Sequence, residues 1–191
     1  SISFSYLIGK FTKKVDIRNY GSGNAGATNT LRVLGKGPAI VVLLLDIAKG
    51  ILAVLISFLF NSAEWVPFVA GLFAIIGHNW PVFFGFRGGK GVATTIGVLL
   101  LLVPLPALLA GVVAISLIFL TKYVSLGSLI FTILTPLFIL FFDQYPLSYF
   151  YIALLLTLLS IWQHRTNIKK IVQGTENKIG EKSNIKEVNQ S

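Results

Sequence analysis

Long apolar runs separated by short polar segments restrict what this chain can fold into. The runs cover residues 38–60, 65–84, 92–121, 126–142 and 147–162. A helix that crosses a bilayer needs about 20 predominantly apolar residues. Only 12% of the residues are charged and 54% are hydrophobic, whereas roughly a quarter of the residues in a soluble domain are charged. The sequence therefore predicts an all-α integral membrane protein.

The run at residues 92–121 is too long for one straight crossing and contains Pro104-Leu105-Pro106. Proline removes a backbone donor and breaks helices, so we expect two shorter helices here. Residues 2–9 are apolar but too short to cross, and the chain has no Met at position 1. We interpret residues 2–9 as the end of a first helix that begins upstream. The expected architecture is a seven transmembrane-helix bundle, its first helix truncated, over residues 1–163, followed by a basic cytoplasmic tail over residues 164–191.

The basic residues are distributed unevenly between the two sides of such a bundle. Fifteen of the 16 Lys and Arg residues lie outside the apolar runs, and seven crossings place all of them on one side. The loops at residues 61–64 and 143–146, on the other side, contain none. Basic loops normally face the cytoplasm. We therefore expect the N-terminus outside, the C-terminus in the cytoplasm and the active-site loops on the cytoplasmic face.

The net charge of +9 resides in short loops beside apolar spans. This position favours anionic membrane lipids and a phosphorylated substrate as partners, rather than nucleic acid. The chain has no Cys, which excludes disulfides, a thiolate nucleophile and a Cys-based metal site. No paired carboxylates occur on the basic side, so no metal and no cofactor are expected.

Asp46 and Lys49 stand three residues apart inside the first long apolar run and share one helix face. Ionisable groups inside a bilayer pair with one another or face a polar cavity. The sequence leaves two interpretations open: an internal ion pair that lets the helix pack, or a pair that also shapes a substrate cavity.

The first cytoplasmic loop, residues 16–32, is rich in Gly, Ser, Thr and Asn. Such loops expose backbone N–H groups that converge on an anion, and a guanidinium holds phosphate oxygens bidentately. We interpret the loop as a phosphate cradle, while a flexible turn-rich loop remains the alternative. Its candidate residues are Ser22, Gly23, Asn24, Thr28, Asn29 and Arg32.

A second candidate anion site surrounds Lys90, where Gly88, Gly89 and Gly91 permit close backbone approach just before a helix N-terminus. It is not a Walker A loop, because Gly91 follows the lysine instead of Ser or Thr. His78, near the end of the preceding helix, is a binding candidate. The alternative is that it simply bonds a free carbonyl group.

Two smaller clusters lie on the same side. Ser125 is either a functional hydroxyl or only the cap of the next helix. His164 and Asn167 follow the last span, where a basic stop is expected in any membrane protein. The acyltransferase pattern of His followed five positions later by Asp is absent, because Phe83 and Lys169 occupy those positions.

Four motifs together resemble the PlsY family of bacterial membrane glycerol-3-phosphate acyltransferases. They are GSGNAGATN at residues 21–29, GHNWPVFFGFRGGKGVAT at 77–94, YVSLGS at 123–128 and HRTNIKKIVQGTENK at 164–178. The resemblance covers nearly the whole chain. Arg87 stands where Lys is expected, and Gly127 where Ala is expected.

The resemblance implies transfer of a fatty acyl group from acyl phosphate to the 1-hydroxyl of glycerol 3-phosphate. The products are lysophosphatidic acid and phosphate, and the location is the bacterial inner membrane. It implies that the functional residues are Ser22, Arg32, Lys90, Ser125, His164, Asn167 and the glycines around Lys90. Of these, Ser22, Lys90, Ser125 and His164 are the catalytic candidates, and no obligate protein partner is inferred.

An acyl phosphate already carries a good leaving group, so the enzyme's main tasks are to position two phosphorylated molecules and offset their repulsion. We expect one phosphate near Ser22, Asn24 and Arg32, the other near Lys90, and the acyl chain between helices. A substrate phosphate oxygen or His164 would accept the hydroxyl proton. The main alternative is a transporter or channel for phosphorylated solutes, which typically shows internal repeats with midplane sites. A structural subunit is a third alternative, although it has no need for dense Gly/Lys loops.

Overall fold

The computed structural model describes residues 1–60, 63–142 and 144–181, and within these ranges the chain forms helices and no strands. The order is α1 Phe4–Lys13, η1 Ile17–Asn19, α2 Ala27–Leu34, α3 Lys36–Phe58, α4 Val66–Asn79, η2 Val82–Phe84, α5 Val92–Leu102, α6 Pro104–Thr121, α7 Val124–Ile139, α8 Leu147–Gln163 and α9 Arg165–Val172. The prediction of an all-helical membrane protein is confirmed. Asn61, Ser62 and Asp143 of the two loops without Lys or Arg, and residues 182–191 of the predicted tail, lie outside the described ranges.

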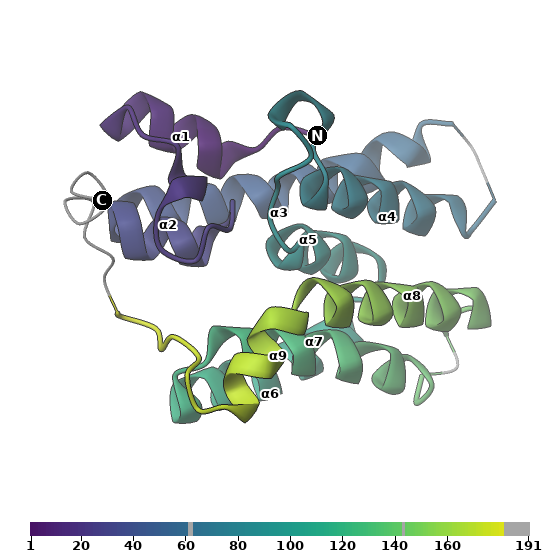
Figure 1. Ribbon diagram of the computed structural model, residues 1–191. Coiled ribbons are helices and arrows are strands. Elements are labelled where there is room, and N and C mark those ends of the chain that lie inside the picture. Colours follow the sequence, from purple (N-terminus) through teal and green to yellow (C-terminus); the bar gives the residue numbers. More distant parts are fainter. Residues whose placement is uncertain (61–62, 143, 182–191) are drawn as a thin grey trace.

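The helices form two neighbouring groups, with α3, α4 and α5 in one and α6, α7 and α8 in the other (Figure 1). Helices α5 and α6 are consecutive and join the groups, and α4 also contacts α8. The short helices α1 and α2 pack against the beginning of the first group, while α9 packs against α7 and α8. The polar segments of the chain therefore lie beside the bundle rather than inside it.

The proline break predicted in residues 92–121 is confirmed. Helix α5 ends at Leu102, Val103 has non-helical angles of φ −137° and ψ 62°, and Pro104 begins α6. Proline fits the first helical turn because its missing N–H would have no partner there. The break produces two helices of 11 and 18 residues.

Other element boundaries shift by a few residues from those expected. Helix α3 begins two residues before Pro38, and α4 ends at Asn79, so that η2 replaces the end of the expected span. Residues 27–34 form helix α2, although residues 16–32 were predicted to be a loop. Helix α1 continues past Gly9 to Lys13.

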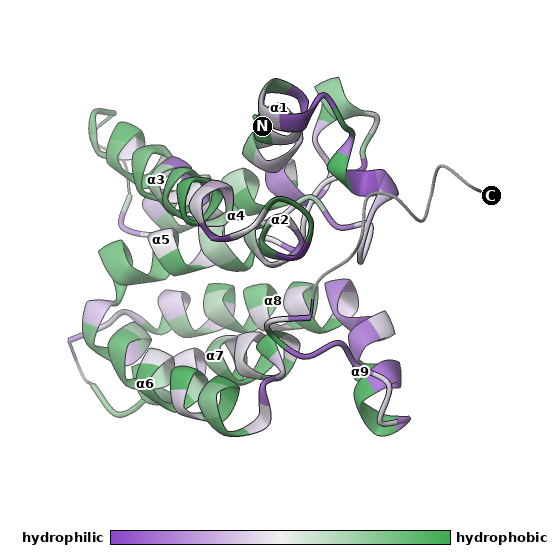
Figure 2. Ribbon diagram, turned by 90° about the vertical axis from the view of Figure 1, so that its left-hand side faces the viewer, coloured by the Kyte–Doolittle hydropathy of each residue, from purple (hydrophilic) through white to green (hydrophobic). Residues whose placement is uncertain are grey.

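Within the described residues, length and composition identify three stretches long and apolar enough to cross a membrane: Lys36–Phe58, Val66–Phe84 and Pro104–Thr121. Helices α8 and α9, bent by 62°, make a fourth when the two are counted as one span. Helices α5 and α7 are apolar but shorter. Figure 2 shows hydrophobic residues along the long helices and hydrophilic ones in α9 and the connecting segments. Three statements about the architecture stay predictions: that the chain crosses the membrane seven times, that the active-site loops face the cytoplasm, and that the bundle ends and the tail begins at residue 163.

Helices α3 and α5 cross closely because each presents a glycine to the other. A Cβ on Gly97 would overlap the Ile47 carbonyl, and a Cβ on Gly50 would overlap the Thr94 carbonyl. Close approach at small residues is a common source of helix association in membranes. The crossing holds the beginning of α5 against the middle of α3.

We expect Gly97→Ala to destabilise the protein, because the extra methyl group must separate the two backbones. Overpacking of this kind costs about 1–3 kcal/mol, which thermal unfolding of the purified protein in detergent would register as a lower Tm. Gly111→Ala is the matched control, since a Cβ there meets nothing within 4 Å. Equal Tm values for the two variants would contradict this account of the crossing.

Candidate active site

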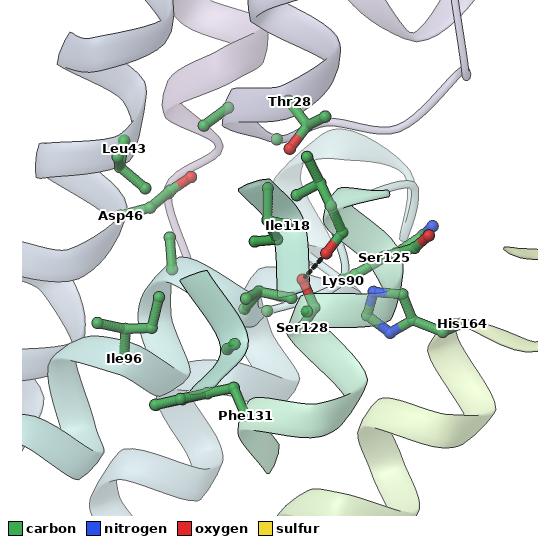
Figure 3. Close-up of a pocket in the computed structure, with 18 of the residues that line it drawn as sticks. Thr28, Leu43, Asp46, Lys90, Ile96, Ile118, Ser125, Ser128, Phe131 and His164 are labelled. Carbon is green, nitrogen blue, oxygen red and sulfur yellow. Dashed lines mark hydrogen bonds between the residues drawn. The ribbon is translucent and has the colours of Figure 1, made fainter. Parts of the chain in front are cut away.

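One cavity of about 420 Å³ collects side chains from all four motif segments. Its polar end is lined by Ser22, Arg32, Lys90, Ser125 and His164, and its other end by apolar side chains. Figure 3 shows Lys90, Ser125 and His164 close together, with Ile96 and Phe131 beyond them. Segments far apart in the sequence therefore meet at one site.

The first motif loop is held in place by its own polar groups. The buried Asn29 side chain donates through Nδ2 to the carbonyls of Ile17 and Tyr20, at 3.1 Å each, and accepts from the Ser22 N–H at 2.9 Å. Its amide is thus used inside the loop. This network fixes the backbone at Ser22, beside the cavity.

Arg18 ties the first motif loop to the second. Its guanidinium donates to both carboxylate oxygens of Asp16 and to the carbonyl of Phe84, at 2.6 Å. The hydrogen bonds from Arg18 hold the pKa of the Asp16 carboxyl below its usual value. The Ala25 N–H also donates to the Gly88 carbonyl at 3.3 Å. The two candidate anion-binding loops therefore form one connected unit.

The glycines beside Lys90 are required by packing. A Cβ on Gly88 would overlap the His78 carbonyl, and a Cβ on Gly89 would overlap the His78 ring. Gly91 has φ +79° and caps α5 at its N-terminus. The turn therefore lies directly on the end of α4 and aims Lys90 at the cavity.

Lys90 donates from Nζ to Oδ1 of Asn167 on α9. Burial lowers the pKa of Lys90 to about 8; nearby Glu176 raises it, while Arg32 and Lys170 lower it further. The ammonium is thus still largely charged at neutral pH, and poorly solvated. Such a cation interacts strongly with an anion that enters its cavity.

Glu176 is a site residue that was not predicted from the sequence. Its Oε1 accepts from Ser125 Oγ and from Asn167 Nδ2, both at 2.7 Å. The expectation of Ser125 as a helix cap is wrong, because α7 begins at Val124 after Tyr123 and the Ser125 hydroxyl bonds Glu176 instead. The only available signal was that Glu176 is the one carboxylate within the basic motif at residues 164–178.

The chain after α9 returns across the site. The guanidinium of Arg32 donates to the carbonyl of Asn177 at 3.2 Å, and the Ile179 N–H donates to the carbonyl of Lys122 at 2.8 Å. Among the described residues, Nε of Arg32 has no hydrogen-bond partner. One edge of this guanidinium is thus unused by the protein.

His164 lies between α8 and α9 and is 2% exposed. Its Nδ1 lies 2.8 Å from the carbonyl of Ser160, which only accepts, so the Nδ1–H donates and Nε2 keeps its lone pair. Burial and the nearby Lys90 charge lower the pKa of His164 to about 4. His164 is therefore a neutral acceptor at physiological pH.

The apolar end of the cavity lies among α5, α6 and α7, where its lining residues include Ile96, Leu100, Leu108, Ile115, Ile118 and Phe131. Helices α6 and α7 pack closely here, since a Cβ on Gly127 would overlap the Ile118 side chain. A long apolar chain suits this environment, while a charged group suits the opposite end.

Eleven of the fourteen site residues expected from the sequence line the cavity. Those that do are Ser22, Asn24, Thr28, Asn29, Arg32, His78, Lys90, Gly91, Ser125, His164 and Asn167. Gly23, Gly88 and Gly89 do not line it. The pair expected inside the first long run is present, with Lys49 Nζ 2.6 Å from Asp46 Oδ1. Asp46 also lines the cavity, so both interpretations apply: the two residues form an internal ion pair, and Asp46 shapes the cavity.

The fold and the cavity define a helical integral membrane protein with one site that is cationic at one end and apolar at the other. Residues 1–174 match the family model described as glycerol-3-phosphate acyltransferase. The chain belongs to this family of acyltransferases.

Two relatives bear the name glycerol-3-phosphate acyltransferase. The protein of Shouchella clausii is 62% identical over 187 residues, covering 95% of this chain and 91% of the relative. That of Halalkalibacterium halodurans is 59% identical with the same coverage.

Two crystal structures of PlsY (YgiH), an integral membrane glycerol 3-phosphate acyltransferase, are similar in fold. The glycerol 3-phosphate form has a TM-score of 0.81 and 41% identity, covering 93% of this chain and 92% of that one. The lysophosphatidic acid form has a TM-score of 0.83 and 41% identity, covering 94% and 89%.

Proposed function

We propose that this protein transfers a fatty acyl group from acyl phosphate to the 1-hydroxyl of glycerol 3-phosphate. The observation that carries the proposal is the single cavity that joins Arg32, Lys90 and His164 to an apolar groove. An acyl phosphate has an anionic head and an apolar chain, as this cavity does. The PlsY structures are described as glycerol 3-phosphate and lysophosphatidic acid forms, which supports the same acceptor and product here.

In the proposed reaction, the 1-hydroxyl oxygen of glycerol 3-phosphate attacks the acyl carbon and forms an ester bond. The bond between that carbon and the phosphate oxygen breaks, and phosphate leaves with the bonding electrons. The hydroxyl proton goes to a phosphate oxygen. Cations at the polar end offset the repulsion of the two phosphates and the charge on the leaving group, and Arg32 and Lys90 supply them.

The pKa values of the two candidate groups favour a substrate phosphate over His164 as the proton acceptor. The second pKa of a phosphate monoester is about 6, whereas the pKa of His164 is lowered to about 4. We assign His164 Nε2 the role of accepting a hydrogen bond from the neighbouring 2-hydroxyl group of glycerol 3-phosphate, which orients the 1-hydroxyl and leaves its single proton free for the phosphate. Ser125, held by Glu176 at 2.7 Å, lies at the same end of the cavity.

Several further features belong to the same proposal. The protein resides in the bacterial inner membrane, with its N-terminus outside and the cavity's polar end at the cytoplasmic face, near anionic lipids. The distribution of Lys and Arg between loops supports this orientation. Ser22 and Asn24 in the first loop, which also contains Gly23, and Thr28 and Asn29 in the first turn of α2 face one phosphate, and Gly88, Gly89 and Gly91 shape the site of the other. No metal or cofactor takes part.

The test uses protein purified in detergent and supplied with palmitoyl phosphate and glycerol 3-phosphate. We expect lysophosphatidic acid and phosphate in equal amounts, measured by mass spectrometry and a phosphate assay. Palmitoyl-CoA in place of the acyl phosphate is the donor control. Product formation from the thioester but not from acyl phosphate would overturn the proposed donor. Uptake of glycerol 3-phosphate into vesicles without any acyl transfer would favour the transporter instead.

Glu176 raises the pKa of Lys90 against the effect of burial, so we expect Glu176→Gln to shift the pH dependence of turnover. Removing the carboxylate removes a group that raises the Lys90 pKa, which then falls below about 8. The ammonium is lost as pH rises through its pKa, so the alkaline decline in rate moves to lower pH. A pH–rate profile measures the shift. An alkaline limb that stays in place or moves upward would contradict the assignment.

A further inference from the structure

The ammonium group of Lys49 has three acceptors around it. Nζ lies 2.6 Å from Asp46 Oδ1, 2.6 Å from His78 Nδ1 and 3.2 Å from the carbonyl of Ile2. An ammonium has three N–H donors and no lone pair. The three contacts therefore match its full donor capacity and bring together α3, α4 and the residues before α1.

This arrangement decides which nitrogen of His78 carries the proton. Lys49 can only donate, so His78 Nδ1 must accept, and the hydrogen of a neutral ring resides on Nε2. Asp46 Oδ1 lies 3.5 Å from the same Nδ1, farther than Lys49. The lysine, positioned by the aspartate, thus selects one tautomer.

The Nε2 edge of His78 faces the glycine turn before α5. A Cβ on Gly89 would overlap Nε2, and the Gly89 N–H donates to the His78 carbonyl at 3.1 Å. His78 and Lys90, one residue beyond Gly89, both line the cavity. Within residues 1–60, 63–142 and 144–181, the hydrogen bonds of the His78 ring involve Nδ1 only. The Nε2–H is therefore unused by the protein at the site where an anion is expected.

We infer that Lys49, held by Asp46, is a positioning residue that fixes neutral His78 with its proton on Nε2, so that His78 donates a hydrogen bond to a phosphorylated substrate. The contact with substrate rests on the proposed function; the tautomer does not. A neutral donor next to the Lys90 ammonium adds a directional contact without adding a second charge. Glycine at position 89 leaves the ring edge accessible.

The tautomer can be measured directly, because the chain contains only two histidines. Protein labelled with ¹⁵N-histidine gives two sets of ring signals, which His164→Gln assigns. At pH 7 and without substrate, we expect His78 to show a protonated Nε2 and an unprotonated Nδ1. In Lys49→Met, the Nδ1–H tautomer or a mixture should replace it, while Lys49→Arg keeps the original one, since arginine also only donates. A wild-type His78 that is protonated on Nδ1 or on both nitrogens would overturn the inference whether or not the variants fold.

Kinetics test the contribution to substrate binding. We expect Lys49→Met to raise KM for one of the two phosphorylated substrates by about tenfold or more, the effect of one hydrogen bond to a charged group. Its kcat should change much less, and Lys49→Arg should recover most of the loss. Lys13→Met, at an exposed position of α1, is the matched control.

Unchanged KM values in a Lys49→Met protein with the altered tautomer would exclude the substrate contact. Equal losses of activity in Lys49→Met and Lys49→Arg would also exclude the substrate contact. Failure of the wild-type protein to use acyl phosphate would refute the proposed function and leave the tautomer result standing.

Discussion

Replacing Lys90 with alanine is expected to lower kcat/KM with acyl phosphate by about 10²–10³-fold or more, the usual effect of removing one fixed group that stabilises transition-state charge. The ammonium is buried at the polar end of the cavity and bonds Asn167, so it is already held in place before substrate enters. Without it, two phosphate groups would share a poorly solvated space with less positive charge. The loss is measured by steady-state kinetics with both substrates varied.

Lys90→Arg keeps the charge but not the shape of a compact ammonium, so we expect partial activity. Because an arginine side chain stays charged, the alkaline decline that accompanies a Lys90 pKa of about 8 should also move to higher pH. Lys122→Met is the matched control, since Lys122 is exposed at the end of α6 and does not line the cavity. A folded Lys90→Ala protein with near wild-type kcat/KM would remove Lys90 from the mechanism.

The helix break and the meeting of distant motifs were accessible from sequence because each depends on a strong local or compositional signal. Pro104 and Pro106 interrupt an apolar run that is too long for one crossing, and α5 ends two residues before Pro104. Basic residues concentrated in a few loops indicate which segments share a membrane face. Those two signals predicted one shared membrane face for Ser22, Lys90, Ser125 and His164, and the resemblance to the PlsY family implied that they act together; all four line one cavity.

Helix α2 lacked such a signal. It has eight residues, and its first turn contains the polar Thr28 and Asn29. A helix this short is marginal on its own and depends on tertiary packing, here against α3. Its composition resembles a turn-rich loop, which is how the sequence was interpreted.

The position of Glu176 also depends on tertiary structure. The residue lies 51 positions from Ser125 and 9 from Asn167, and its carboxylate bonds both. No periodicity links Glu176, one of three carboxylates in the predicted basic tail, to a helix start so far away. Similarly, the spacing of Asp46 and Lys49 indicates their ion pair, but only the packing of α4 on α3 adds His78 to it.

Removing the His164 ring is expected to reduce turnover without changing the shape of the pH–rate profile. His164→Ala leaves the 2-hydroxyl group of the substrate without its acceptor, and we expect a loss of kcat/KM of about 10–100-fold from one unmade hydrogen bond at a buried site. His164→Gln supplies an amide oxygen and should retain part of the activity. Rates from pH 4 to pH 9, with Tm measured at each pH, provide the test.

The sign of the pH effect separates the two candidate proton acceptors. With its pKa lowered to about 4, His164 is neutral above that pH, so a histidine base would give an acid limb near pH 4 that disappears in His164→Ala. A substrate phosphate becomes a dianion only above about pH 6, which gives an acid limb near that value in both proteins. We expect the second result, because the phosphate is the stronger base by about two pKa units. An acid limb in the wild-type protein that is lost with the ring would instead assign the proton to His164.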